Sequence, residues 1–126
     1  MTTELRTYAF VLAVPDLPKA AAYFQSALGF KTDWVDGDNW HTLSRDGVRV
    51  MMGHCPDQIP PEDLGDHNFF GYMHVDDVNA LYAEWSKTGA IIRKPPADKP
   101  WGLREMAVGL PDGHRFMVAQ VLGRAS

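Results

Sequence analysis

Apolar and polar positions along the chain form two successive sets of the same pattern. Residues 7–14 (TYAFVLAV) are apolar almost throughout and predict a buried strand. Residues 15–30 then predict a helix, and three further apolar runs follow at 30–36, 39–45 and 48–55. Because Asp-Gly-Asp and Asp-Gly separate these three runs, we expect them to form strands in hairpin succession. The first half of the chain therefore predicts the order βαβββ.

The pattern restarts after a connection at 55–66 that is rich in proline and acidic residues. The second set comprises a strand at 67–75, a helix at 76–90 and strands at 90–96, 104–110 and 114–122. Residues 46–51 (DGVRVM) and 112–117 (DGHRFM) correspond in letters, which indicates an internal duplication. We expect a single domain over residues 1–126, with a first module at about 5–56 and a second at about 66–123.

Both expected helices carry residues that mark their ends. Asp16 can accept hydrogen bonds from the free N–H groups of a first helical turn, and Gly29 can adopt the left-handed conformation that closes a helix. In the second module, Asp76 or Asp77 is expected to cap the start of the helix and Gly89 to close it. These caps strengthen both helix predictions.

Alternation along the first strand of each module predicts which side meets the helix. The side expected under the helix carries Phe10, Leu12 and Val14 in the first module, and Phe69, Met73 and Val75 in the second. The opposite side carries Phe70, Tyr72 and His74 in the second module. We therefore predict the α+β class: two βαβββ modules that form curved mixed sheets, helices outside, and a cleft between the concave faces.

Two segments resemble motifs of one superfamily. Residues 14–30 (VPDLPKAAAYFQSALGF) are similar to the first-module motif of the glyoxalase, bleomycin-resistance and extradiol dioxygenase (vicinal oxygen chelate) superfamily. Residues 100–114 (PWGLREMAVGLPDGH) are similar to its second-module motif, Trp-Gly-x-Arg followed by a Pro-Asp-Gly turn. The resemblance covers nearly the whole chain. It implies a homodimer, with the modules paired either within one chain or swapped between two.

The resemblance also bears on metal binding. In metal-dependent members four cleft-facing positions hold the ligands, and in this chain they correspond to Ala9, Met51, Phe70 and Met117. Methyl, thioether and phenyl groups offer a hard divalent ion neither an anionic oxygen nor an imidazole nitrogen. The resemblance therefore implies the metal-free, bleomycin-resistance-like branch, with no metal ligands and no cofactor. A register shifted by one residue would instead bring His41, His54 or His74 to the cleft and rebuild a metal site.

Catalytic motifs do not stand out in the sequence. Histidine is the usual general base near neutral pH, but only His74 is expected at the centre of a cleft-facing strand. The chain contains no Gly-rich phosphate loop, no Gly-x-Ser-x-Gly elbow and no His-Glu-x-x-His motif. The lone Cys55 can form no internal disulfide. We assign no catalytic residue.

Aromatic and thioether side chains favour a binding function, because flat rings stack on planar or cationic ligands and methionine adapts to irregular shapes. The residues expected to contact a ligand are Trp34, Trp40, Thr42, Met51, Phe70, Tyr72, His74, Trp101, Arg104, Met106, Arg115 and Met117. For Tyr82 and Trp85, on the second helix, we expect a core position instead. The strand that contains Trp40 is similar in pattern to that of bleomycin-binding proteins.

The charge distribution argues against nucleic acid as a partner. The chain has a net charge of −4, and an acidic surplus runs from Asp33 to Asp66. Such a surplus would attract a cationic ligand, although scattered surface acids also serve only to keep a protein soluble. No signal peptide or membrane segment stands out, so we expect a cytoplasmic protein that binds no membrane.

These features lead to a hypothesis of function. We expect a metal-free binding protein that sequesters an aromatic, cationic natural product or antibiotic, in resistance or self-protection. The alternative is a superfamily enzyme, a lyase, isomerase or dioxygenase with a displaced metal site or a cofactor-free catalyst that uses His74, Arg104 or Arg115. A further alternative is a regulatory module whose own side chains fill the cleft.

Overall fold

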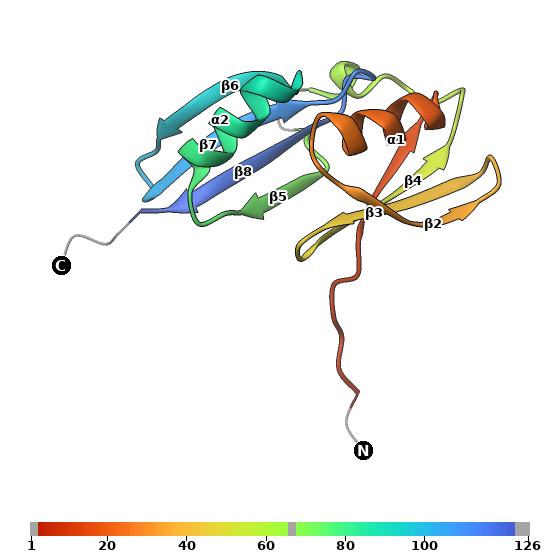
Figure 1. Cartoon of the computed structure of the whole chain (residues 1–126), viewed down its shortest axis with the longest axis horizontal. Coiled ribbons are helices and arrows are strands. Elements are labelled where there is room, and N and C mark those ends of the chain that lie inside the picture. Colours follow the sequence, from red (N-terminus) through yellow and green to blue (C-terminus); the bar gives the residue numbers. More distant parts are fainter. Residues whose placement is uncertain (1–2, 66–67, 123–126) are drawn as a thin grey trace.

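The computed structural model, which describes residues 3–65 and 68–122, contains two four-stranded sheets and two α-helices (Figure 1). The first module comprises β1 (Phe10–Val14), α1 (Leu17–Ser26), β2 (Lys31–Asp36), β3 (Trp40–Arg45) and β4 (Val48–His54). The second comprises β5 (Gly71–His74), α2 (Val78–Thr88), β6 (Ile91–Asp98), β7 (Leu103–Gly109) and β8 (Arg115–Val121). The predicted α+β class and the repeated βαβββ order are confirmed.

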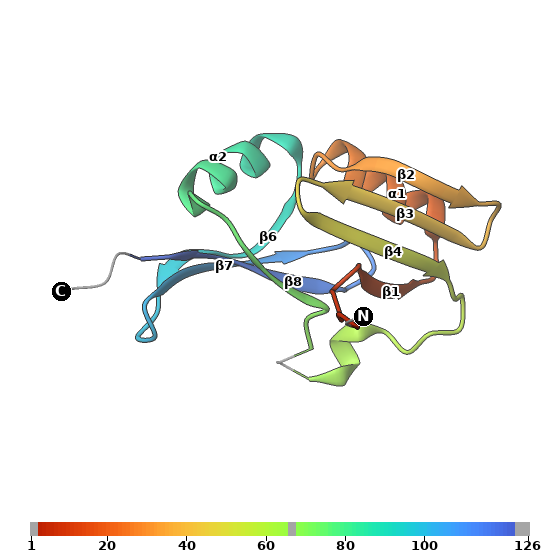
Figure 2. The ribbon, with the colours of Figure 1, turned by 90° about the horizontal axis from the view of Figure 1, so that it is seen from below.

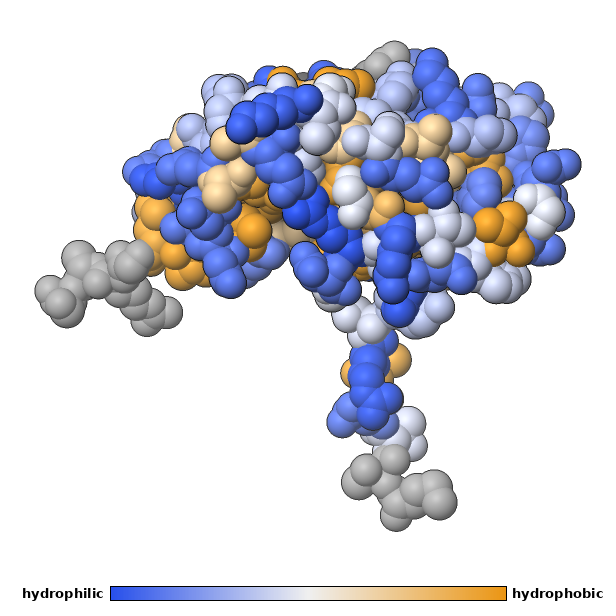
Figure 3. All heavy atoms as spheres, viewed as in Figure 1, coloured by the Kyte–Doolittle hydropathy of each residue, from blue (hydrophilic) through white to orange (hydrophobic). Residues whose placement is uncertain are grey.

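Both sheets have the same topology. Sheet A has the order β1-β4-β3-β2 and sheet B the order β5-β8-β7-β6. In each sheet the first strand pairs in parallel with the last, and the other pairs are antiparallel. The two sheets lie side by side, and each helix packs against one face of its own sheet, so each sheet has a helix side and an open side (Figures 1 and 2). In the space-filling view, hydrophilic side chains cover much of the surface between smaller hydrophobic patches (Figure 3).

Contacts between the helices and the opposite module join the two halves. Trp85 on α2 is buried, and its indole Nε1 donates to the Leu28 carbonyl of the first module at 3.3 Å. Tyr23 on α1 donates its hydroxyl to the Gly109 carbonyl at 2.6 Å and accepts from the Ile91 backbone N–H. Burial raises the pKa of Tyr23, which keeps this bridging hydroxyl protonated. A single hydrophobic core therefore spans both modules.

The helix caps agree with the sequence. Asp16 Oδ1 accepts from the Lys19 backbone N–H at 3.1 Å, and Asp77 Oδ1 accepts from that of Ala80 at 3.0 Å. Of the two candidates for the second cap, the structure therefore places Asp77 at that position. Gly89 closes α2 with a left-handed φ of 85°. No helix in the described residues is long and apolar enough to span a membrane.

Alternation predicts the buried side of sheet A correctly but fails at the start of sheet B. Leu12 and Val14 are buried under α1 as expected. In the second module, the expected strand from His67 forms only from Gly71, and His67 itself lies outside the described residues, as does Asp66 at the end of the acidic run. The chain bends at Phe70, so the alternation of β5 does not extend back to it. The prediction for this pair is therefore wrong: Phe69 lines the open side of sheet B, and Phe70 packs against Phe116 in the core.

A candidate ligand site on the open side of sheet B

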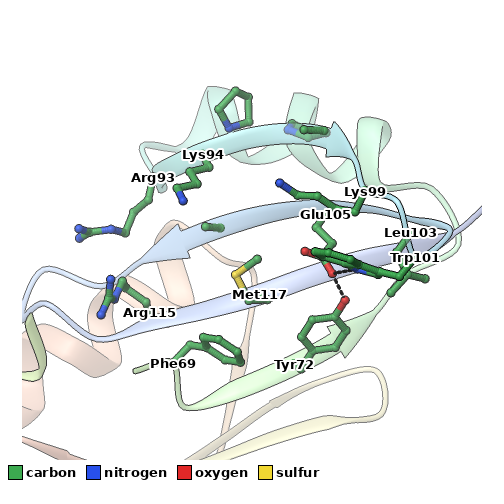
Figure 4. A pocket seen from close by; sticks show the side chains of 14 residues that line it. Phe69, Tyr72, Arg93, Lys94, Lys99, Trp101, Leu103, Glu105, Arg115 and Met117 are labelled. Atoms are coloured by element: carbon green, nitrogen blue, oxygen red, sulfur yellow. Dashed lines mark hydrogen bonds between the residues drawn. The ribbon is translucent and has the colours of Figure 1, made fainter. Parts of the chain in front are cut away.

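A cavity of about 1150 Å³ lies over the open side of sheet B (Figure 4). Strands β5, β7 and β8 form its floor, and β6 with the turn that follows it forms one wall. Its aromatic lining comprises Phe69, Tyr72 and Trp101, its charged lining comprises Arg93, Lys94, Lys99, Glu105 and Arg115, and its smaller apolar lining includes Leu103, Ala107 and Met117. The cavity thus combines ring surfaces with ionised groups.

A carboxylate is held rigidly at one end of this cavity. Glu105 is only 7% exposed, and its Oε2 accepts hydrogen bonds from the Tyr72 hydroxyl and, at 2.9 Å, from the Trp101 indole Nε1 (Figure 4). A buried carboxylate is stable only when donors compensate for its lost hydration, and these two side chains supply them. Among residues 3–65 and 68–122, no hydrogen bond ends on Glu105 Oε1. That oxygen is therefore available to a donor outside the chain.

Tyr72 remains a donor over the whole physiological pH range. Burial, reinforced by the hydrogen bond to Glu105 and the charge of Glu105, raises the pKa of Tyr72 to about 12. A tyrosinate beside a carboxylate would place two negative charges in hydrogen-bond contact. The pair therefore keeps one negative charge, on Glu105, and one neutral hydroxyl.

Positive charge surrounds the rest of the cavity. Arg93 and Lys94 lie on β6, Lys99 lies in the turn after it, and Arg115 begins β8. In the part of the chain that the structure describes, none of these four cations forms a salt bridge. By contrast, Arg45, Arg49 and Arg104 each have a carboxylate partner within 4.0 Å. The acidic run from Asp33 to Asp66 contributes no residue to the cavity lining, and the cavity is predominantly cationic.

The open side of sheet A carries the other expected aromatic residues. Trp34, Thr42 and Met51 are neighbours across β2, β3 and β4, and Trp40 is on the same side of β3. A Cβ added to Gly53 would meet the Trp40 ring at 3.0 Å, so this ring covers the glycine. Within one chain, these four residues lie apart from the cavity on sheet B.

The structure divides the expected ligand contacts of the second module into two groups. Tyr72, Trp101, Arg115 and Met117 line the cavity. His74 is on the same side of β5, with its ring 5.9 Å from that of Tyr72, but does not reach the lining.

Three expected contacts face elsewhere, and for these the sequence interpretation is wrong. Phe70 packs in the core against Phe116. Met106 is fully buried in the core, and Arg104 forms an ion pair with Asp98 at 2.6 Å. For Arg104 and Met106 the physical reason is the strand register: Glu105 occupies the open side of β7, so the residues on either side of it point away. Phe70 lies in the bend before β5 and does not follow the alternation of that strand.

The sequence interpretation missed five aromatic or charged lining residues: Phe69, Arg93, Lys94, Lys99 and Glu105. A signal for Glu105 exists in the turn before β8. The turn pairs Gly109 with Arg115 and therefore Ala107 with Met117. Glu105 lies on β7 two residues before Ala107, so it faces the same side of the sheet. For Arg93 there is no such signal, because the β6–β7 ladder changes register between Ile92 and Lys94.

The sequence of the chain matches a known protein family over most of its length. Residues 7–118 match the family model described as Glyoxalase/Bleomycin resistance protein/Dioxygenase superfamily. The chain belongs to this superfamily. No curated protein sequence matches the chain significantly.

Several solved structures share the fold at low sequence identity. The bleomycin-binding protein from bleomycin-producing Streptomyces verticillus, complexed with copper(II)-bleomycin, has a TM-score of 0.72 and 22% identity over 98% of this chain and 100% of that chain. A bleomycin resistance determinant encoded on the transposon Tn5 has a TM-score of 0.76 and 23% identity over 92% and 98%. TioX from Micromonospora sp. ML1 has a TM-score of 0.69 and 23% identity over 96% and 100%.

The side chains at the metal positions of the superfamily do not fit a divalent ion. By the resemblance, these positions are Ala9, Met51, Phe70 and Met117. Met51 and Met117 lie on the open sides of different sheets and present only thioethers, and Phe70 lies in the core. His41 pairs with Met52, on the helix side of sheet A. Over residues 3–65 and 68–122, no three His, Cys, Asp or Glu side chains gather closely enough to hold a metal ion.

Proposed function

We propose that this chain binds an aromatic small molecule, such as a natural product or antibiotic, and acts by sequestering it without a metal. The observation that carries the proposal is the cavity on sheet B, in which Phe69, Tyr72 and Trp101 surround the oriented carboxylate of Glu105. Pockets for drug-sized molecules typically measure about 300–1,000 Å³ and combine apolar walls with a few placed polar groups. At about 1150 Å³ this cavity is large enough for a ligand with several rings.

The aromatic rings would stack on the ligand, and the carboxylate would accept a hydrogen bond from it. Trp101 is 63% exposed, so its ring surface is available for stacking, which contributes on the order of 1 kcal/mol per pair. Its indole N–H is already engaged by Glu105, which fixes the orientation of the ring. Glu105 Oε1 would accept a hydrogen bond from a protonated amine or a hydroxyl of the ligand. A cationic group on the ligand, as the sequence suggested, would find its partner here.

The exposed aromatic surface supports a homodimer as part of the proposal. Val11 and Trp34 on the open side of sheet A are exposed, and so are Tyr72 on the open side of sheet B and Trp101 in the turn between β6 and β7. Monomeric proteins rarely leave contiguous apolar surface of this kind uncovered. A second copy that laid its sheet A over this sheet B would cover both and enclose the ligand. Light scattering should then give twice the chain mass of 14.1 kDa.

Calorimetric titration tests the binding proposal. We expect at least one of bleomycin, a quinoxaline and a cationic acridine dye to bind with a Kd below about 100 µM, that is, with more than about 5 kcal/mol of binding free energy. Trp101→Ala should weaken that binding about tenfold or more, because a stacked anchor in a desolvated site commonly contributes more than 1 kcal/mol. Tyr82→Ala is the matched control, since Tyr82 packs against the core from α2.

Two results would count against sequestration. One is that none of the three compounds binds with a Kd of about 100 µM or less, because a dedicated binding protein should bind its ligand at least that tightly. The other is stoichiometric retention of zinc, manganese, nickel or iron through desalting, with activity that a chelator abolishes. The second result would favour the enzyme alternative.

A further inference from the structure

Two arginines converge at the end of the cavity that lies away from Glu105 (Figure 4). Arg115 pairs with Gly109 in the β7–β8 ladder. From the other neighbouring strand, Arg93 extends across the same glycine: a Cβ added to Gly109 would lie 3.0 Å from Arg93 Cδ and 3.2 Å from its Cγ. Because Gly109 has no side chain, the side chain of Arg93 can pass over it toward Arg115. Figure 4 shows the two guanidinium groups pointing toward each other.

In the first module, the two positions that correspond to Arg93 and Arg115 carry opposite charges. The repeat matches Arg115 with Arg49, since both follow an Asp-Gly turn by two residues. The ladders match Arg93 with Asp33, since each lies where the register shifts, between Ile92 and Lys94 or between Thr32 and Trp34.

In the first module these matched positions form an ion pair, with Arg49 Nε 3.9 Å from Asp33 Oδ2. Arg49 also lies 4.4 Å from the centre of the Tyr8 ring. In the second module, a cation replaces the carboxylate. Two like charges therefore stand where the duplicated frame otherwise holds a pair of opposite charges.

The second arrangement leaves donors without acceptors. Arg115 donates from Nη2 to the Gly65 carbonyl at 2.6 Å, but its Nε is buried and has no hydrogen-bond partner among residues 3–65 and 68–122. Arg93 and the neighbouring Lys94 form no salt bridge within the described residues. An unsatisfied buried donor destabilises the folded protein, and adjacent like charges add to that cost. An anion between the two guanidinium groups would remove both penalties, because guanidinium binds carboxylate or phosphate with two parallel hydrogen bonds.

We infer that Arg93 and Arg115, with Lys94 beside them, form an anion subsite of this cavity that takes a carboxylate, phosphate or sulfate group of its ligand. This inference rests on the proposed binding function and adds to it the chemical class of the ligand. The ligand is an aromatic compound with an acidic group at the arginine end. A hydroxyl or amine at its other end meets Glu105.

Three probes that share one ring system test the charge requirement. They are 2-naphthoate, which is anionic, 2-naphthamide, which is neutral, and 2-naphthylmethylammonium, which is cationic. With the wild-type protein in low salt, we expect 2-naphthoate to bind at least about tenfold more tightly than 2-naphthamide, equivalent to about 1.4 kcal/mol. Arg93→Gln and Arg115→Gln should each bring the affinity for 2-naphthoate down to that for 2-naphthamide and leave the amide unchanged. Lys87→Gln on α2 is the control for loss of one positive charge outside the cavity.

A charge reversal adds a second readout. Arg93→Asp copies the arrangement of the first module, so the introduced carboxylate would pair with Arg115, as Asp33 does with Arg49. The preference for 2-naphthoate should then disappear while the fold persists. A preference that survives this substitution would overturn the subsite.

Failure of the subsite and failure of the binding function give different results. If the wild-type protein binds all three probes equally, or if Lys87→Gln lowers the affinity for 2-naphthoate as much as Arg93→Gln does, the anion subsite is refuted while the aromatic cavity stands. If none of the three probes and none of the larger aromatic compounds binds, the binding function itself is refuted.

Discussion

The open sides of sheets A and B share a backbone frame and differ at matching positions. Met51 and Met117 correspond in the repeat, and two residues further along each strand lie Gly53 and Ala119. The residue paired with Gly53 is Trp40, whose ring covers it, whereas the residue paired with Ala119 is Glu105. Trp40 and Glu105 thus occupy matching positions, and in the first module this position carries a ring that packs on its own sheet.

The second module carries at this position a carboxylate at the edge of a cavity. Asp33 and Arg93 differ in a similar way, because Asp33 has a partner of opposite charge and Arg93 has none within the described residues. The duplicated frame is thus compatible with two roles, and the side chains at a few matched positions decide between them. The family-model match over residues 7–118 identifies the superfamily, but the ligand chemistry depends on the side chains at these matched positions.

The largest effect we predict concerns the two sides of sheet B. Met106→Ala should lower the free energy of unfolding by about 2–5 kcal/mol, because Met106 is fully buried and its loss leaves a void in the core. Met117→Ala, on the cavity side, should cost less than half as much, since solvent or ligand can occupy the vacated space. Urea unfolding followed by circular dichroism measures both. Equal losses would contradict the assignment of Met117 to an open side.

A smaller effect should separate the tryptophans of the two open sides. Trp40→Ala should cost about 1–3 kcal/mol of stability, because the ring packs over Gly53, and a partly exposed ring loses less than a core one. Trp101→Ala should change stability by less than about 1 kcal/mol, because that ring is 63% exposed. The same urea experiment applies to both variants. A greater loss of stability at Trp101 than at Trp40 would reverse the roles assigned to the two sides.

Most of the fold could be predicted from the sequence because its signals are local. Asp16 and Gly89 carry the capping chemistry of a helix within a few residues of its ends, and both act as expected. The repeated Asp-Gly turns fix the hairpins, and the hairpins reveal the duplication. The start of β5 was less predictable. Pairing with the neighbouring strand decides where β5 begins, whereas the apolar residues of the sequence extend to positions before that start.

The candidate site was only partly predictable, for reasons of register. Alternation within β5 and β8 places Tyr72 and Met117 correctly. Glu105 was missed because the sequence interpretation assigned the wrong parity to β7, and a shift of one residue exchanges the two sides of a strand. Arg93 could not have been found by alternation, since the irregularity between Ile92 and Lys94 interrupts it.

The smallest effect should appear only at high pH and only on sheet B. In the ladders, Tyr72 is paired with Met117 as Val11 is with Met51, so one open side carries an ionisable hydroxyl where the other carries an alkyl group. Burial and the neighbouring Glu105 raise the pKa of Tyr72 to about 12 from its ordinary value of 10.0, so the fold favours the protonated form.

This contribution to stability is fully present below pH 10 and is lost as the pH rises from 10 toward about 12. Because Tyr72 is 38% exposed, solvent should screen part of the effect. Urea unfolding of the wild-type protein and of Tyr72→Phe should therefore show a stability difference that shrinks over this interval. The difference in absorbance near 295 nm between the two proteins should report one tyrosine that ionises late. If that tyrosine titrates near pH 10 and the stability difference stays constant, then Tyr72 does not donate to Glu105, and the carboxylate on sheet B lacks the support that distinguishes this side from sheet A.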